Sequence, residues 1–374
     1  MTTAIRFGSC GLLAAATLAL LALAGCAQVE PVSLQAPRRA LVFPGPPDPP
    51  RFVFERAIYS SADVEVEKES DRMRRAVTGE QRGGQGLNKP YAIAVHRGRI
   101  YLSDSVDRFV KVFDMPAGRQ FTIGDDEPGR LNKPLGIDID RNGNLYVADS
   151  TVRTIMVYDR DGKYLRKIGG PKFFDRLASV TVDPAGTRIY VVDIGGVQSE
   201  NHRVRVFDAV SGEHLMDIGK RGVGPGEFNL PRDVAIGKGG QLYVVDGGNF
   251  RIQVFERDGR YLHGFGTVGR QPGNFARPKE IATDKEGNVY VVDTAFGNFQ
   301  IFNAEGDLLM FVGDRNEQDG PARYMLPSGI AVDEDGRVYM VDQWFRKIEV
   351  YRPADLPADA GWLGKSAVRP PAAK

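Results

Sequence analysis

The chain has few of the residues that build disulfide frameworks and metal centres. Its 374 residues include two cysteines and four histidines. No paired CxxC, HExxH motif or Ser-His-Asp order is visible. A fold that lacks disulfides must be held together by its own core. The sequence therefore gives no support for a cysteine or histidine zinc centre or for a serine-hydrolase triad.

An excess of charge of one sign is also lacking. The chain has 49 Lys and Arg against 48 Asp and Glu, a formal net charge of +1. No global field then attracts nucleic acid or an acidic surface. We expect no nucleic-acid partner.

Long hydrophobic runs are absent except at the start of the chain. Arg6 precedes an almost pure Leu/Ala run from Leu12 to Leu23, and Ala24 and Gly25 follow before Cys26. This order predicts an export signal over residues 1–25. The alternatives are a plain signal peptide without lipid and an uncleaved membrane anchor.

The tetrapeptide that ends in Cys26 resembles a bacterial lipobox. The resemblance implies cleavage before Cys26 and a diacylglycerol on its sulfur, so that the protein is held at a membrane by its N-terminal lipid. Ala27 follows. In lipoproteins of two-membrane bacteria a residue other than Asp there implies the periplasmic side of the outer membrane.

Residues 26–50 have the composition of a tether. Seven prolines lie in this stretch. Such a composition favours extended polyproline II over a packed core. We expect a semi-rigid spacer here.

Six related segments organise the rest of the chain. Each is a Tyr-Val-Val-Asp type run, and the final aspartates lie 44 to 53 residues apart. They are Asp104, Asp149, Asp193, Asp246, Asp293 and Asp342. A period of this size indicates repeated supersecondary units that stack on one another.

Each unit contains four short strand patterns separated by glycine turns. A Pro-x-Gly-Ile-Ala-Val type run comes first, then the Tyr-Val-Val-Asp run, an Arg-Ile-x-Val-Phe type run and a Tyr-Leu-x-x-Ile-Gly type run. In this pattern residues 51–352 resemble the NHL-repeat family of six-bladed β-propellers. The resemblance implies an all-β fold of six four-stranded antiparallel blades.

The sixth unit lacks its fourth strand. After Lys347 to Tyr351 the chain becomes rich in Pro and Ala, over residues 353–374. The run Phe54 to Ile58 matches the fourth-strand run Tyr164 to Ile168. We therefore expect Phe52 to Tyr59 to complete the last blade and to close the ring, because an unpaired edge would expose its backbone. A charged segment with a weak helical pattern follows over residues 63–82, and the alternatives for it are a solvated surface helix and a partner-binding element.

The turns inside the units are similar, whereas the segments on the opposite face vary. The varying face contains the link from each fourth strand to the next first strand and the loop after each repeat aspartate. Function usually lies in such loops on a rigid scaffold. The glycine-rich links at 222–228 and 269–275 are not followed by a helix start, so a phosphate loop is not indicated. We expect the six aspartates themselves to hold turns or nearby arginines such as Arg203 and Arg251.

Two units break the symmetry at the start of the first strand. Most units have a small residue at the second of two aligned positions, but the fourth and fifth units have Asp233 and Glu280, preceded by Arg232 and Lys279. Tyr91 is the first-position residue of the first unit. Charges at a channel mouth are costly unless they are paired or used. The alternatives are two self-compensating ion pairs and a ligand or divalent-cation site.

The loops after the repeat aspartates supply further candidate contacts. The third-unit loop, Gly195 to His202, is about four residues longer than its counterpart Gly247 to Phe250. Its candidates are Asn201 and His202, or it is a plain surface insertion. Other candidates are Asn249, Arg251 and Trp344. With Phe250 and Phe296, Trp344 suggests a carbohydrate or peptidoglycan binder as a weaker option, and the alternative is that these three rings pack against neighbouring loops.

Two function classes follow. The first is a lipid-anchored, non-enzymatic binding or scaffolding propeller of the cell envelope, a monomer without a cofactor that presents its varying face to a protein or small ligand. The second is a metal-assisted hydrolase or lyase, in which Asp233 and Glu280 bind a divalent cation or act as acid and base, while Arg232, Lys279 and Tyr91 contact the substrate. Six-bladed lactonases, which share the fold, use an acidic cluster at the channel mouth in this way.

Overall fold

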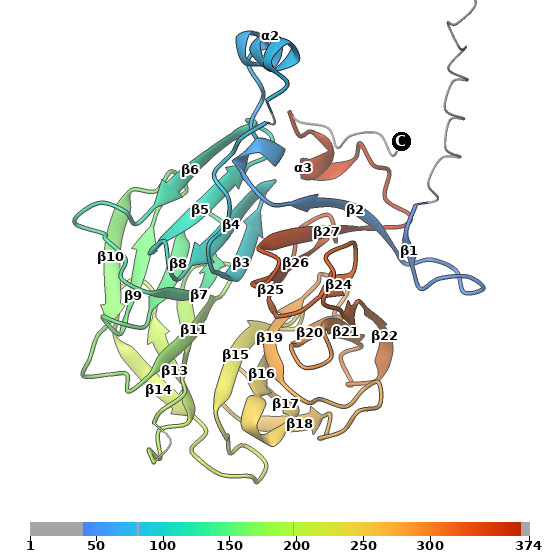
Figure 1. The fold of residues 1–374 in the computed structure, drawn as a ribbon. Helices are drawn as coiled ribbons and strands as arrows, with labels where there is room; N and C mark the ends of the chain where they lie inside the picture. Colours follow the sequence, from blue (N-terminus) through green and yellow to red (C-terminus); the bar gives the residue numbers. More distant parts are fainter. Residues whose placement is uncertain (1–39, 81, 197, 368–374) are drawn as a thin grey trace, which may run out of the picture. The chain divides into compact units, whose positions relative to one another are not determined.

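The computed structural model describes residues 40–80, 82–196 and 198–367. The predicted signal peptide, Cys26 and the tether up to residue 39 lie outside the described residues. Six antiparallel sheets surround a central axis (Figure 1). No helix in the described part is long and apolar enough to cross a membrane.

Each blade has four strands, named outward from the axis, and the sheet of blade six has the short strand β1 (Val42–Phe43) as a fifth, outermost strand. Blade one contains β3 (Pro90–His96), β4 (Arg99–Asp104), β5 (Phe109–Asp114) and β6 (Arg119–Ile123). Blade two contains β7 (Pro134–Ile139), β8 (Leu145–Asp149), β9 (Thr154–Tyr158) and β10 (Tyr164–Gly169). Blade three contains β11 (Leu177–Val182), β12 (Arg188–Asp193), β13 (Arg203–Asp208) and β14 (His214–Ile218). Blade four contains β15 (Pro231–Ile236), β16 (Leu242–Asp246), β17 (Arg251–Phe255) and β18 (Tyr261–Phe265). Blade five contains β19 (Pro278–Thr283), β20 (Val289–Asp293), β21 (Asn298–Phe302) and β22 (Leu308–Val312). Blade six contains β25 (Pro327–Val332), β26 (Val338–Asp342), β27 (Lys347–Pro353) and, as its fourth strand, β2 (Phe52–Ile58).

The last blade therefore joins both ends of the described chain. β2 pairs antiparallel with β27, with Phe54 opposite Tyr351 and Ile58 opposite Ile348. The strand predicted from the sequence, Phe52 to Tyr59, ends one residue earlier in the structure. Arg337, fully buried, donates from Nε to Glu55 Oε2 at 2.8 Å and from Nη2 to the Ala360 carbonyl at 3.0 Å. One side chain thus ties β2 to the C-terminal segment.

The tether prediction needs one correction. Val42 and Phe43, inside the stretch predicted to be an extended spacer, form β1 (Val42–Phe43) and pair with Val53 and Phe52. The Phe43 ring packs edge-on against Tyr351, with 5.7 Å between centroids. An apolar side chain that covers a buried ring explains why this short piece pairs with β2 and is not part of a free spacer.

The hydrophobic core is divided into six clusters, one between each pair of neighbouring blades. The cluster between the last and first blades contains Val341 and Ile348 of blade six with Ile93 and Leu102 of blade one. The near-continuous apolar runs of the second strands follow from this arrangement, because each sheet is covered on both faces. The ring is closed by the same kind of packing that holds its other five joints.

Several short helices and strands lie outside the six blades. The segment at 63–82 contains α2 (Glu69–Thr78), none of whose residues is buried, and η1 (Ser61–Asp63) precedes it. Near the C-terminus, α3 (Gly361–Gly364) buries Leu363 in the cluster that closes the ring. The last link contains the parallel pair β23 (Asp314–Arg315) and β24 (Arg323–Tyr324), and η2 (Gly247–Asn249) follows β16.

Candidate functional site

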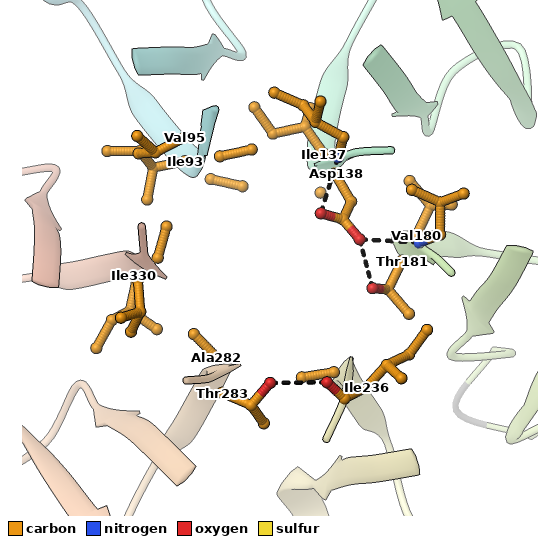
Figure 2. Close-up of a pocket in the computed structure, with 18 of the residues that line it drawn as sticks. Ile93, Val95, Ile137, Asp138, Val180, Thr181, Ile236, Ala282, Thr283 and Ile330 are labelled. Carbon is orange, nitrogen blue, oxygen red and sulfur yellow. Dashed lines mark hydrogen bonds between the residues drawn. The ribbon is translucent and has the colours of Figure 1, made fainter. Parts of the chain in front are cut away.

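A central channel runs along the inner strands β3, β7, β11, β15, β19 and β25. Its cavity of about 480 Å³ is lined in the middle by apolar side chains, among them Ile93, Ile137, Val180 and Ile330 (Figure 2). Asp233 and Glu280 line this cavity near the start of their strands, and His96, Arg97 and Glu334 line its opposite end. The entrance at the start of the inner strands lies on the face of the links and of the loops that follow the second strands.

The repeat aspartates are structural, as the sequence predicts. All six have fully buried side chains. Asp104 is typical: its Oδ2 accepts the amides of Asn88 and Lys89, and its Oδ1 accepts those of Val106 and Asp107. Each aspartate thus fastens a link to the loop beside it. The predicted arginine contacts are present in two blades, as Arg203 with Asp193 and Arg251 with Asp246.

Asp233 holds three blades together. Its Oδ1 accepts the Ser179 hydroxyl of blade three at 2.6 Å, and its Oδ2 accepts the Ile281 amide of blade five at 3.0 Å. The side chain is 8% exposed. Burial raises the pKa of this carboxyl to about 6, although these hydrogen bonds act in the opposite direction.

Glu280, at the aligned position of the next blade, is hydrogen-bonded less completely than Asp233. It is 7% exposed, and its Oε1 has no hydrogen-bond partner within the described residues. Burial, and then the nearby Asp233 carboxylate, hold the pKa of Glu280 well above its ordinary value. Burial of the carboxyl therefore favours its protonated form.

The structure does not show the two self-compensating ion pairs that were one alternative. Neither Arg232–Asp233 nor Lys279–Glu280 forms an ion pair in the described part of the chain; Asp233 binds groups of the neighbouring blades instead. The Lys279 ammonium lies over the Tyr91 ring, 4.4 Å from its centroid. Burial lowers the pKa of Lys279 to about 8, and burial also raises the pKa of the Tyr91 hydroxyl. Arg232 is exposed.

Asp138 is a channel residue that the sequence analysis missed. Its Oδ2 accepts the Thr181 hydroxyl at 2.5 Å and the Val182 amide at 2.8 Å, both from the next blade (Figure 2). Burial raises its pKa. A signal was present in the repeat. The other five units have Ala or Thr at this position of the first strand, and only the second has an acid.

Most loop candidates are occupied with holding their own loops. Asn201 Nδ2 donates to Asp175 Oδ2 at 2.7 Å, and His202 is buried, with Nδ1 accepting the Leu230 amide at 3.2 Å. Asn249 and Arg251 both bind Asp246 and the backbone of the link before β15.

The aromatic candidates differ in exposure. Trp344 is 62% exposed, whereas Phe250 and Phe296 are half-buried. The structure thus places one of the three aromatic rings in solvent.

The residues present do not fit a metal centre. The described chain contains no group of three His, Cys, Asp or Glu side chains placed to hold an ion. Both oxygens of Asp233 already accept protein donors, which leaves Glu280 Oε1 as the free atom of the pair. One carboxylate oxygen falls short of the several oxygen ligands that divalent cations such as Mg²⁺ and Ca²⁺ take.

Sequence comparisons match short parts of the chain. The family model for the NHL repeat matches residues 228–255. NHL repeat-containing protein 3 of Homo sapiens is 36% identical over 89 residues, which are 24% of each chain. A probable peptidyl-alpha-hydroxyglycine alpha-amidating lyase of Caenorhabditis elegans is 32% identical over 115 residues, 29% of this chain and 31% of that one. The matched parts thus span 24% and 31% of these relatives' lengths.

Solved structures match over more of the chain at low identity. A protein of unknown function from Bacteroides thetaiotaomicron covers 79% of this chain and 75% of its own, with a TM-score of 0.59 and 16% identity. A gluconolactonase of Xanthomonas campestris covers 80% and 98%, with a TM-score of 0.55 and 15% identity. A streptogramin B lyase covers 71% and 94%, with a TM-score of 0.53 and 13% identity. At these identities the likeness concerns the fold alone.

Proposed function

The chain is an NHL-repeat six-bladed β-propeller, and from that premise we propose that it is a lipid-anchored binding module of the cell envelope. The lipobox-like sequence that ends in Cys26 supports the anchor, on the periplasmic side of the outer membrane. The ligand or protein partner is held on the face of the links and loops, around the channel mouth. This face is called the loop face below, and the face of the tight glycine turns is called the turn face.

The observation that carries the proposal is the contrast between the two faces. On the loop face, the tips of two links and one loop expose large apolar side chains, at Val223 (76%), Val268 and Trp344, and on the turn face the turn between β13 and β14 exposes Val210. Link and loop lengths there differ from blade to blade. On the turn face, residues such as Asp140 and Asp284 close near-identical turns by accepting backbone amides. Varying, exposed apolar tips on a rigid frame are typical of a recognition surface.

Photo-cross-linking in cells tests this assignment of faces. A photoreactive residue is placed at Val223 or Trp344 on the loop face and, as matched controls, at Asp161 or Lys285 on the turn face. All four sites are exposed. We expect adducts from the loop-face positions and none above background from the controls. Adducts from the turn face alone would overturn the proposal.

A second candidate function is a hydrolase or lyase that uses Glu280 as an acid or base. The observation that favours it is the unpartnered Oε1 of Glu280 beside a cavity, in a carboxyl whose pKa is raised by burial. The relatives named as lyases and lactonases make this class worth testing. The metal-assisted version lacks ligands, since no group of three such side chains exists among the described residues.

Two measurements separate this candidate from a binding module. Elemental analysis compares the purified wild type with an Asp233→Ala/Glu280→Ala double variant. It detects a stoichiometric divalent ion whose binding depends on these two carboxyl groups. A panel of lactones and esters is then assayed with the wild type and Glu280→Gln. Turnover that falls at least about a hundredfold in Glu280→Gln favours the enzyme. No turnover by the wild type, or equal turnover by the variant, removes it.

A further inference from the structure

Six cations surround the channel mouth, and five of the six blades contribute them. Lys89, Lys133, Arg176 and Arg277 each stand immediately before an inner strand, and Arg232 and Lys279 are the second residues of β15 and β19. These six residues are called the mouth cations below. All are exposed except Lys279, which is half-buried.

Their backbones are fixed while their charged groups are free. The amides of Lys89, Lys133, Arg176 and Arg277 all donate to repeat aspartates. The charged groups of the mouth cations make no hydrogen bond or ion pair with the part of the chain described by the structure, apart from the contact of Lys279 with the Tyr91 ring. The propeller thus holds six Cα atoms rigidly and leaves their side chains available.

In the part of the chain that the structure describes, the nearby acids bind other groups and form no ion pair with a mouth cation. Asp107 is paired with Lys111 at 3.0 Å, and Asp175 accepts from Ser199 and Asn201. Asp233 is buried beneath the mouth and bound by two donors, and burial raises the pKa of Glu280. Burial is the largest cause of the lowered pKa of Lys279; Glu280 and Asp342 oppose it, and the neighbouring cations Arg232 and Lys89 add to it.

We propose that the mouth cations bind a compact polyanion, a soluble molecule with at least two phosphate or carboxylate groups, over the channel mouth. This inference rests on the proposed binding function and names the ligand class for it. Cations that converge from five blades onto one axis concentrate their field at a single point. An extended polyanion such as a nucleic-acid strand instead requires a charged groove along its length. Arginine guanidinium groups suit both phosphate and carboxylate oxygens because they donate two parallel hydrogen bonds.

Calorimetric titration of the full-length protein tests the proposal. The probes are inorganic tripolyphosphate and citrate, each at low salt and at high salt. The test variant is Lys89→Ala/Arg176→Ala/Arg277→Ala. The control is Arg141→Ala/Lys163→Ala/Lys238→Ala, which removes the same charge from exposed turn-face positions. Because the mouth side chains have no structural partners, both variants should melt within about 2 °C of the wild type.

We expect the wild type to bind at least one probe in a salt-dependent manner. The Kd should rise by at least about tenfold in the mouth variant and by less than about twofold in the control. No binding by the wild type, or equal weakening in both variants, would overturn the inference. So would a single-stranded oligonucleotide that binds more tightly than both probes and depends on the same residues. If loop-face photo-cross-links persist while the probes fail to bind, the polyanion is wrong and the binding function stands.

Discussion

At the scale of single residues, the channel acids serve as cross-links between blades. The inner strand of each blade presents one edge to the axis, and its amides have no sheet partner on that side. Asp138 and Asp233 supply acceptors to the next blade's amides, at Val182 and Ile281. Each such acid gives a buried amide donor a hydrogen-bond partner. An unpaired buried donor would cost about 1–3 kcal/mol. Burial of the carboxylate opposes this gain, and it raises the pKa values of Asp138 and Asp233.

This burial makes stability depend on pH in a specific direction. Asp233 has a pKa of about 6 in the folded protein against 3.8 as the ordinary value. Between these values the folded chain keeps a proton that the unfolded chain has released. The contribution of Asp233 to stability therefore falls as the pH rises from about 4 to about 6, and stays at the lower level above that.

Asp233→Asn should remove this pH dependence while keeping an acceptor for the Ile281 amide. The quantity to compare is the unfolding free energy of the variant minus that of the wild type. This difference should be about 2–3 kcal/mol more favourable to the variant at pH 7.5 than at pH 4. Denaturant unfolding at the two pH values measures it. A difference between variant and wild type that is the same at both pH values would show that Asp233 is ionised equally in the folded and unfolded chains.

At the scale of elements, the ring depends on the borrowed strand β2. Arg337 is fully buried and is held by Glu55 on β2 and by the Ala360 carbonyl. Arg337→Ala would leave the Glu55 carboxylate buried without its partner. We expect a loss of about 3–5 kcal/mol in unfolding free energy. The control is Arg260→Ala, an exposed residue 3.4 Å from Glu256, which should cost under about 1 kcal/mol. Similar losses in both variants would contradict the proposed lock.

Removal of β2 itself is a stronger test of closure. Deletion of residues 51–60 exposes the edge of β27 and the side chains packed on it. The melting temperature should fall sharply, by more than about 10 °C. Replacement of α2 by a short flexible linker is the matched control, because no residue of that helix is buried. A deletion that melts like the wild type would show that the ring does not need its fourth strand there.

The sequence predicted the elements much better than the site. Periodic runs ending in aspartate fixed the number of blades, and the incomplete sixth unit pointed to β2. Such features are local patterns repeated six times. The bonds from Asp138 and Asp233 to the next blade depend on how neighbouring sheets are offset around the axis, which no local pattern encodes. For the same reason the pairing of Val42 and Phe43 on β2, and the inward orientation of Asn249 and Arg251, could not be predicted.

At the scale of the whole molecule, the proposed binding face belongs to a chain whose N-terminus is proposed to be anchored by lipid. Cys26 lies outside the described residues, and its lipid is a proposal that cell fractionation can test. Wild-type protein should sediment with membranes and be released by detergent, and Cys26→Ala should not acquire lipid, as metabolic labelling with a fatty acid would show. Labelled Cys26→Ala protein, or unlabelled wild type, would remove the anchor from the account.

The central claim, that the loop face is the occupied face, can be measured directly by hydroxyl-radical footprinting of the protein in its own envelope and after purification. Val223 and Trp344 on the loop face are 76% and 62% exposed, and Val210 on the turn face, at 70%, provides a matched reference. We predict that Val223 and Trp344 are protected in the envelope relative to the purified protein, while Val210 is labelled equally in both. Protection of Val210 with none at Val223 and Trp344 would contradict the account.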